Sequence, residues 1–311
     1  MIKPIKKHLF INEFLLAFLM VCVSVNATCQ EKAGSGTDSN SKTEKQDKKK
    51  KNKKYKLPNI DLSHWSVTTP ELNAKGGATS VQPPAILKYA TDERLKKYMY
   101  NDSTDGSLVF YAYPSEATTA NTKYSRSELR EQMVPGDNKT NWTFAQGAYM
   151  KGKLAMDEVS KDKNGKYHKV IIMQIHGVLT DEQRDLIGQK DNNAPPILKI
   201  YWDNGKIRVK TKVLKNLSTP NEGLLFEEAW GDDEGFDFEQ VVGFEKFTLE
   251  IKVSAGKMVV VLNNNEFKVY ENIHMRKWGI LENYFKAGNY FQSRDEGAFA
   301  RVKYYELEVK H

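Results

Sequence analysis

The 311-residue sequence is poor in cysteine. Its two cysteines, Cys22 and Cys29, lie in or beside an N-terminal apolar run, and residues 30–311 contain none. A domain folded from those residues therefore has no internal disulfide and must be stable through its core alone. Hydrophobic residues make up 40% of the chain and aromatic residues 11%, which is enough for a sizeable core. The length fits one large domain or two smaller ones.

The N-terminal apolar run, Phe14–Val25, is too short to cross a bilayer but suits the core of a signal peptide. Lysines at positions 3, 6 and 7 precede it, and "VNA" ending at Ala27 resembles a cleavage site for signal peptidase. We therefore expect residues 1–28 to be a signal peptide rather than a core helix. Cys29 follows a loose lipobox, so the protein is expected to be exported either as an outer-membrane lipoprotein anchored at Cys29 or as a secreted protein.

A basic excess is missing from most of the chain. The net charge is +7, but residues 1–56 contain 13 Lys against 5 Asp and Glu, which leaves 34 basic and 35 acidic residues in the remainder. This balance argues against a nucleic-acid partner, and any anion site must be built from local groups. Residues 29–56 are rich in Lys and Ser and nearly free of apolar residues, so we expect a disordered tether that acts as a spacer or a weak anchor to an acidic surface.

From Leu57 onward, long amphipathic helix patterns are scarce, and Thr91–Tyr100 is the best short helical candidate. Short runs of β-branched and aromatic residues dominate instead. They are interrupted by Asn204-Gly205, Ala255-Gly256 and Asn263–Asn265, which are typical of hairpin turns. The pattern predicts a single all-β domain over residues 57–311, a β-sandwich or jelly roll.

Three of the predicted strands carry polar or charged groups at alternate positions and mostly apolar residues between them. The polar positions are Arg126, Glu128 and Arg130 in "YSRSELRE", Gln174 and His176 in "KVIIMQIHG", and Tyr284, Lys286, Tyr290 and Gln292 in "YFKAGNYFQ". Alternate residues of a strand project from one face. Taken singly, each pattern has an ordinary explanation. Arg-x-Glu-x-Arg can be a ladder of salt bridges on a solvated sheet, a lone strand His is commonly a structural or surface residue, and Tyr and Lys are common on exposed strands. Together on adjacent strands they would form a groove suited to an extended acidic polymer, with arginine forks binding its carboxylates.

"RSELR" (Arg126–Arg130), "QIH" (Gln174–His176) and "YFKAGNYFQ" (Tyr284–Gln292) resemble, in order and spacing, the signature blocks of polysaccharide lyase family seven, the alginate lyases. "LSHWSVTTP" (Leu62–Pro70) resembles the usual opening of that domain, in which a short strand ends in Pro. The resemblance extends over Leu57–His311. It implies an alginate lyase catalytic domain with a jelly roll of two antiparallel sheets and a concave cleft, and a substrate of alginate or a related polyuronate.

The implied reaction is β-elimination at a 4-linked uronate. Its main obstacle is the charge that builds up beside the carboxylate when the C5 proton is removed, and donors from Arg126 and Gln174 would offset that charge. The resemblance makes Tyr290 the proton donor to the leaving oxygen, and His176 can be a neutral base. For a mannuronate, Tyr290 could serve as both base and acid. For a guluronate, His176 would take the proton and Tyr290 would return one.

The remaining groups are expected to support this chemistry. Glu128 is expected to orient the two arginines, and the substrate-binding or supporting groups are Arg130, Tyr284, Lys286 and Gln292. In the family, Ile at the position of Ile175 accompanies acceptance of guluronate-containing stretches. No metal or cofactor is expected, and a monomer is expected. The acidic segment Phe226–Glu239 could nevertheless hold calcium, form a lid, or be a solvated loop.

Two other function classes remain open from the sequence. A jelly-roll glycoside hydrolase needs two carboxylates across its cleft, but Glu128 is the only one in the three blocks, and its arginine neighbours would keep it ionised. A non-catalytic polysaccharide-binding module would have no particular use for His176 and Tyr290 beside the carboxylate donors.

Overall fold

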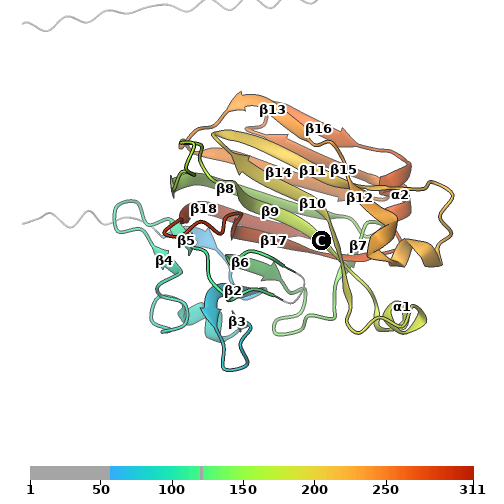
Figure 1. The fold of residues 1–311 in the computed structure, drawn as a ribbon, viewed down its shortest axis with the longest axis horizontal. Helices are drawn as coiled ribbons and strands as arrows, with labels where there is room; N and C mark the ends of the chain where they lie inside the picture. Colours follow the sequence, from blue (N-terminus) through green and yellow to red (C-terminus); the bar gives the residue numbers. More distant parts are fainter. Residues whose placement is uncertain (1–56, 120–121) are drawn as a thin grey trace, which may run out of the picture. The chain divides into compact units, whose positions relative to one another are not determined.

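A computed structural model describes residues 57–119 and 122–311 of the chain (Figure 1). The expectations for the signal peptide at residues 1–28, the lipid anchor at Cys29 and the tether at residues 29–56 all lie outside the described residues. Within the described ranges, no helix is both long enough and apolar enough to cross a membrane.

Two sheets make up the described part of the chain, and nearly all of their strand pairs are antiparallel. We call them the back sheet, with eight strands in the described residues, and the front sheet, with ten. The back sheet has the order β16-β15-β14-β8-β18-β5-β4, with β1 paired in parallel to β18. The front sheet has the order β12-β11-β10-β9-β17-β6-β2-β3, with β13 paired to β11 and β7 paired to β17.

The back-sheet strands are β1 (Asn59–Ile60), β4 (Met99–Asn101), β5 (Leu108–Ala112), β8 (Ala148–Val159), β14 (Phe247–Ser254), β15 (Lys257–Leu262), β16 (Glu266–Tyr270) and β18 (Ala300–Lys310). The front-sheet strands are β2 (Trp65–Leu72), β3 (Ala78–Val81), β6 (Arg126–Glu131), β7 (Trp142–Thr143), β9 (Val170–Val178), β10 (Asn193–Asp203), β11 (Lys206–Leu214), β12 (Trp230–Asp232), β13 (Phe236–Val241) and β17 (Glu282–Phe291). The helical elements are η1 (Ala85–Lys88), α1 (Asp181–Leu186), η2 (Glu222–Leu225), η3 (Glu227–Ala229) and α2 (Ile273–Trp278).

The core lies between the two sheets and is built by strand alternation. Met173 and Ile175 of β9 are fully buried, as are Phe285 and Phe291 of β17. Each such side chain contributes about 1.5–3 kcal/mol on burial. Because these positions turn inward, the alternate residues of the same strands lie on the outer face of the front sheet. The expected all-β jelly roll of two antiparallel sheets is confirmed.

The predicted hairpins are confirmed by the backbone. Asn204 and Gly205 join β10 to β11, and both have positive φ angles, 53° and 88°, as a type I′ turn requires. Asn263 and Asn264 do the same between β15 and β16, with φ of 50° and 61°.

The helix expected at Thr91–Tyr100 is wrong. These residues form successive turns, in which Leu95 N–H donates to the carbonyl of Asp92, and β4 begins at Met99. Leu95 and Met99 are fully buried. A segment this short gains little as a helix because nucleation is costly, so tertiary packing of its apolar side chains decides the conformation. Pro70 also does not end its strand, since β2 continues to Leu72 past an irregularity in its pairing with β3.

Candidate active site

The three segments singled out in the sequence are neighbouring strands. β17 lies between β9 and β6 in the front sheet (Figure 1). Tyr290 is paired with Arg126 of β6, and Tyr284 with His176 of β9. Lys286 is paired with partners on both sides, Arg130 and Gln174. Arg126, Glu128, Arg130, Gln174, His176, Tyr284, Lys286 and Tyr290 therefore share the outer face of these strands, which we call the site face. Gln292 lies just past the end of β17, on the same alternation.

Glu128 binds the donors of this face. One oxygen, Oε1, accepts from Gln174 Nε2 at 2.5 Å, while Oε2 lies 3.2 Å from Arg126 Nη1 and 2.5 Å from Lys286 Nζ. The Glu128 side chain has no exposed surface. One carboxylate thus positions two cations and an amide from three strands and does not itself face a ligand.

The expectation that Glu128 orients both arginines is wrong for Arg130. The guanidinium of Arg130 donates instead to backbone carbonyls of Glu131 (2.6 Å) and Asn138 (2.8 Å) and to Asn141 Oδ1 (3.2 Å). Alternation places Arg130 on the face of Glu128, but the loop that follows β6 provides its acceptors.

Arg126 retains unused hydrogen-bonding capacity. Its Nε and Nη2 atoms are buried and have no hydrogen-bond partner among residues 57–119 and 122–311. The Tyr290 ring covers the guanidinium, with Cζ 3.7 Å from the ring centroid. Buried donors without a partner cost about 1–3 kcal/mol each, so an incoming carboxylate that accepted from them would be bound favourably.

His176 is held as a neutral ring with one free nitrogen. Its Nδ1 lies 2.9 Å from the carbonyl oxygen of Gly177, which can only accept, so Nδ1 carries the proton and Nε2 has a free lone pair. The ring stacks on Tyr284 at 5.3 Å between centroids. Burial, and next the positive charge of Lys286, lower the pKa of His176 to about 3.

Lys286 and Tyr290 are shifted mainly by burial. Burial lowers the pKa of Lys286 to about 8; the negative charge of Glu128 opposes this shift, and the positive charge of Arg126 adds to it. Burial also raises the pKa of the Tyr290 phenol, while Arg126 opposes that rise. At neutral pH the site therefore has a protonated phenol, a neutral imidazole and an excess of positive charge.

Two groups that the sequence reading missed extend the site face on β10. Lys199 is paired with Gln174 and Tyr201 with Ile171. The sequence contained a signal for them, because the apolar residues Leu198 and Ile200 alternate with these two polar ones. Both apolar side chains are fully buried in the structure.

The acidic segment Phe226–Glu239 lies beside these residues. Its Asp232 pairs with Lys199 and, at 2.8 Å, with Lys212, and its Asp237 pairs with Arg208. No cluster of three or more His, Cys, Asp or Glu in the described ranges could hold a metal ion. Ion pairing with neighbouring lysines and arginine therefore accounts for at least these two carboxylates.

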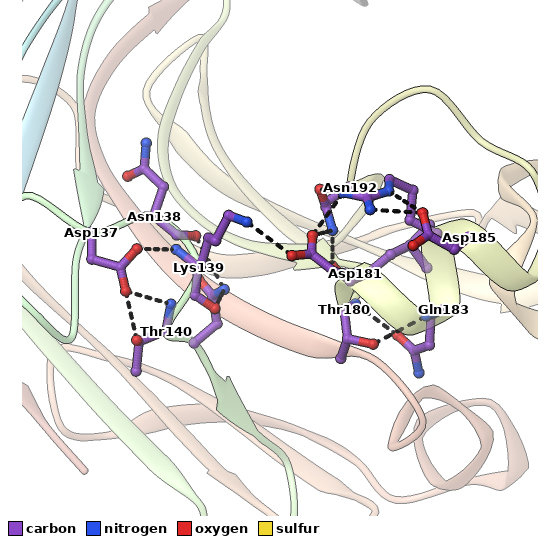
Figure 2. Close-up of polar contacts among 12 residues, drawn as sticks. Asp137, Asn138, Lys139, Thr140, Thr180, Asp181, Gln183, Asp185 and Asn192 are labelled. Atoms are coloured by element: carbon purple, nitrogen blue, oxygen red, sulfur yellow. Dashed lines mark hydrogen bonds and ion pairs between the residues drawn. The ribbon is translucent and has the colours of Figure 1, made fainter.

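Figure 2 shows the polar contacts between the loop that follows β6 and the start of α1. Lys139, in the loop after β6, forms an ion pair of 2.8 Å with Asp181 at the start of α1, which follows β9. Asp137 holds the first loop by accepting from Lys139 and Thr140, and Thr180 caps α1. This bridge joins the segments that follow the two neighbours of β17, at the end where Tyr284 and His176 lie.

A cavity of about 940 Å³ lies elsewhere, beside Trp65, Glu131 and the C-terminal His311, and no predicted site residue lines it. The candidate site described above consists instead of side chains on the outer face of the front sheet.

The family model for alginate lyase matches residues 60–311. The chain belongs to the alginate lyase family. It is 26% identical over 296 residues to an alginate lyase of Klebsiella pneumoniae, a match that covers 81% of this chain and 90% of the relative. The expected family and enzyme class, a polysaccharide lyase, are confirmed, which favours them over the glycoside hydrolase and binding-module alternatives.

Solved structures of alginate lyases share the fold. The family 7 alginate lyase A1-II′ is 30% identical, with a TM-score of 0.64 over 81% of this chain and 96% of the other. Variants of A1-II′ were solved with the product GGG (29% identical, TM-score 0.65, 81% and 97% covered) and with the substrate GGMG (28%, 0.64, 81% and 94%). An alginate lyase from Pseudomonas aeruginosa, 21% identical with a TM-score of 0.59, supports the fold alone.

Proposed function

We propose that this alginate lyase cleaves its polymer by β-elimination, releases unsaturated oligosaccharides and accepts guluronate-containing stretches. The observation that carries the proposal is the arrangement of Arg126, Gln174, His176 and Tyr290 on three adjacent strands with their side chains on one face. The GGG and GGMG complexes of the related A1-II′ variants support acceptance of such stretches.

Carboxylate binding comes first in this mechanism. The unpartnered Nε and Nη2 of Arg126 and the second amide hydrogen of Gln174 donate to the uronate carboxylate. These donors stabilise the charge that develops when the C5 proton leaves, and they are held in place by Glu128 before substrate arrives.

Proton transfer completes the reaction. For a guluronate, Nε2 of His176 takes the C5 proton, the C–H electrons form the C4–C5 double bond, the C4–O bond breaks, and Tyr290 protonates the leaving oxygen. The low pKa of free His176 reflects burial and the cations around it. A bound carboxylate offsets that charge and makes the imidazole a stronger base. For a mannuronate, the small fraction of Tyr290 that is ionised takes the C5 proton and passes it to the leaving oxygen as the C4–O bond breaks, and the Arg126 guanidinium on its ring stabilises that phenolate.

Ultraviolet absorbance during incubation with alginate tests the reaction class. An elimination creates one absorbing carbon–carbon double bond and one reducing end with each cleavage. The number of double bonds, measured by absorbance, should therefore equal the number of new reducing ends. New reducing ends without absorbance would refute the elimination. If neither appeared, the protein would bind alginate without cleaving it.

We expect His176→Ala to lower kcat on polyguluronate by about 100-fold and on polymannuronate by less than about five-fold. The reason is that only the guluronate reaction needs a base separate from Tyr290. Initial rates on the two block polymers measure this difference, and equal losses on both would contradict the division of roles.

We expect polymer binding to weaken as the pH rises through about 8, the pKa of Lys286. Binding of a uronate favours the protonated amine, so affinity is retained below that pKa and lost above it. Losing this positive charge from the site face should raise Kd for the anionic polymer by about ten-fold between pH 7 and pH 10. Titration of oligoalginate into Tyr290→Phe measures Kd without turnover. Adding Lys286→Arg should flatten the profile because a guanidinium stays charged; an unchanged profile would exclude Lys286 as its source.

A further inference from the structure

The strand that carries Lys286 and Tyr290 contains a β-bulge between them. Against β6, β17 pairs without interruption from Lys286 to Tyr290. Against β9, the register shifts: Ala287 pairs with Met173, but Tyr290 pairs with Ile171. Gly288 and Asn289 thus lie opposite the single residue Ile172.

The bulge determines where Tyr290 lies relative to the other reacting groups. If the register of Lys286 with Gln174 and Ala287 with Met173 continued without a shift, Tyr290 would be opposite Val170, one residue further from Gln174 and His176. One residue of a strand is about 3.3 Å. The bulge therefore moves the phenol toward the imidazole by about that distance while keeping Tyr290 beside Arg126.

Two buried side chains, Tyr304 and Asn289, link this bulge to the back sheet by hydrogen bonds. The Tyr304 hydroxyl of β18 accepts from Gly288 N–H at 3.1 Å and donates to the Ile172 carbonyl at 2.6 Å, so it bridges β17 and β9 at the irregularity. The Asn289 amide donates to the carbonyls of Phe110 (3.0 Å) and Ala300 (2.8 Å). Tyr304 and Asn289 are both fully buried.

Gly288 is the position at which only glycine fits. Its φ is +135°, and an added Cβ would lie 2.7 Å from the Ser127 carbonyl oxygen and 3.0 Å from Glu128 Cα. The close approach keeps β17 against β6 at the level of Glu128. The backbone conformation, the hydroxyl bridge and the amide contacts therefore all maintain one local geometry.

We propose that Tyr304 is a positioning residue for the elimination: its hydroxyl, from the opposite sheet, fixes the bulge that sets the spacing between Tyr290 and His176. The proposal rests on the proposed roles of those two residues. Tyr304 does not reach the site face, so it acts only through the backbone of Gly288 and Ile172.

The test is Tyr304→Phe, which removes the bridging hydroxyl and keeps the ring. A displacement of 1 Å at a reacting group can cost about 100-fold, so a partial shift should lower kcat on polyguluronate about ten-fold. Polymannuronate, which needs no Tyr290–His176 spacing, should lose less than about three-fold, and KM should change less than about two-fold on both. Asn289→Ser, assayed in parallel, should change the ratio of the two rates in the same direction.

Tyr270→Phe is the matched control, because Tyr270 is a buried tyrosine of β16 whose hydroxyl has no partner among the described residues. It should keep the wild-type ratio. A loss of folded enzyme lowers both rates equally, so an unchanged ratio in Tyr304→Phe, with or without a general loss of rate, would overturn the inference. Failure of the assigned roles would appear separately, as activity in Tyr290→Phe or equal losses in His176→Ala.

Discussion

Tyr290→Phe is expected to lose about 1,000-fold in kcat on both block polymers, because it removes the proton donor that the mechanism assigns to the leaving oxygen. Polymer binding should persist. The Arg126 guanidinium packs against the Tyr290 ring, not its hydroxyl, and a phenylalanine ring keeps that contact. The measurement is kcat by ultraviolet absorbance together with Kd for oligoalginate.

The pair of readouts separates chemistry from folding. A variant that binds alginate normally but does not turn over has kept its site and lost a reacting group. Tyr270→Phe should behave as wild type in both assays, since its hydroxyl makes no hydrogen bond within the described part of the chain. Activity in Tyr290→Phe within ten-fold of wild type would show that another group protonates the leaving oxygen.

Glu128→Ala is expected to destabilise the fold by about 3–5 kcal/mol, the range for removing one partner of a buried ion pair. Arg126 and Lys286 would be left as buried neighbours without the carboxylate that they share, and Gln174 would lose its acceptor. With stabilities of about 5–15 kcal/mol for whole proteins, such a loss is a large fraction of the total. Urea unfolding at pH 7 measures it.

A matched carboxylate provides the control for this variant. Glu158 pairs with Arg301 on the back sheet, but its side chain is 51% exposed, so Glu158→Ala should change stability by less than about 1 kcal/mol. Glu128→Gln keeps the size of the side chain and removes its charge. Its loss of stability should lie between those of Glu128→Ala and Glu158→Ala. Equal effects of Glu128→Ala and Glu158→Ala would mean that the buried carboxylate does not hold the site together.

Much of the site could be predicted from the sequence, because the alternation of side chains along a strand depends only on neighbouring residues. In "RSELR" and "QIH", polar residues two positions apart must lie on the same face of an extended chain, and the structure places them there. The hairpin at Asn204-Gly205 could also be predicted, since Asn and Gly are the residues that most readily adopt positive φ angles. The Thr91–Tyr100 helix failed because burial of Leu95 and Met99 outweighed weak local propensity.

The hydrogen-bond partners of each side chain could not be predicted from the sequence, because they depend on which segments the fold brings beside it. Alternation put Glu128 between two arginines, yet its carboxylate binds Arg126, Gln174 and Lys286, while Arg130 turns to the following loop. The signal for Lys199 was present in its own strand, but its importance appears only when β10 pairs with β9.

By itself, the amino-acid sequence determined which residues can form the site face, since alternation in an extended chain is a property of neighbours along one strand. Only the tertiary structure decided that β9, β17 and β6 are adjacent, and that a bulge held by Tyr304 brings Tyr290 toward His176. Strand order and bulge geometry depend on contacts between segments more than 100 residues apart, such as Tyr304 with Ile172, and no local pattern encodes them.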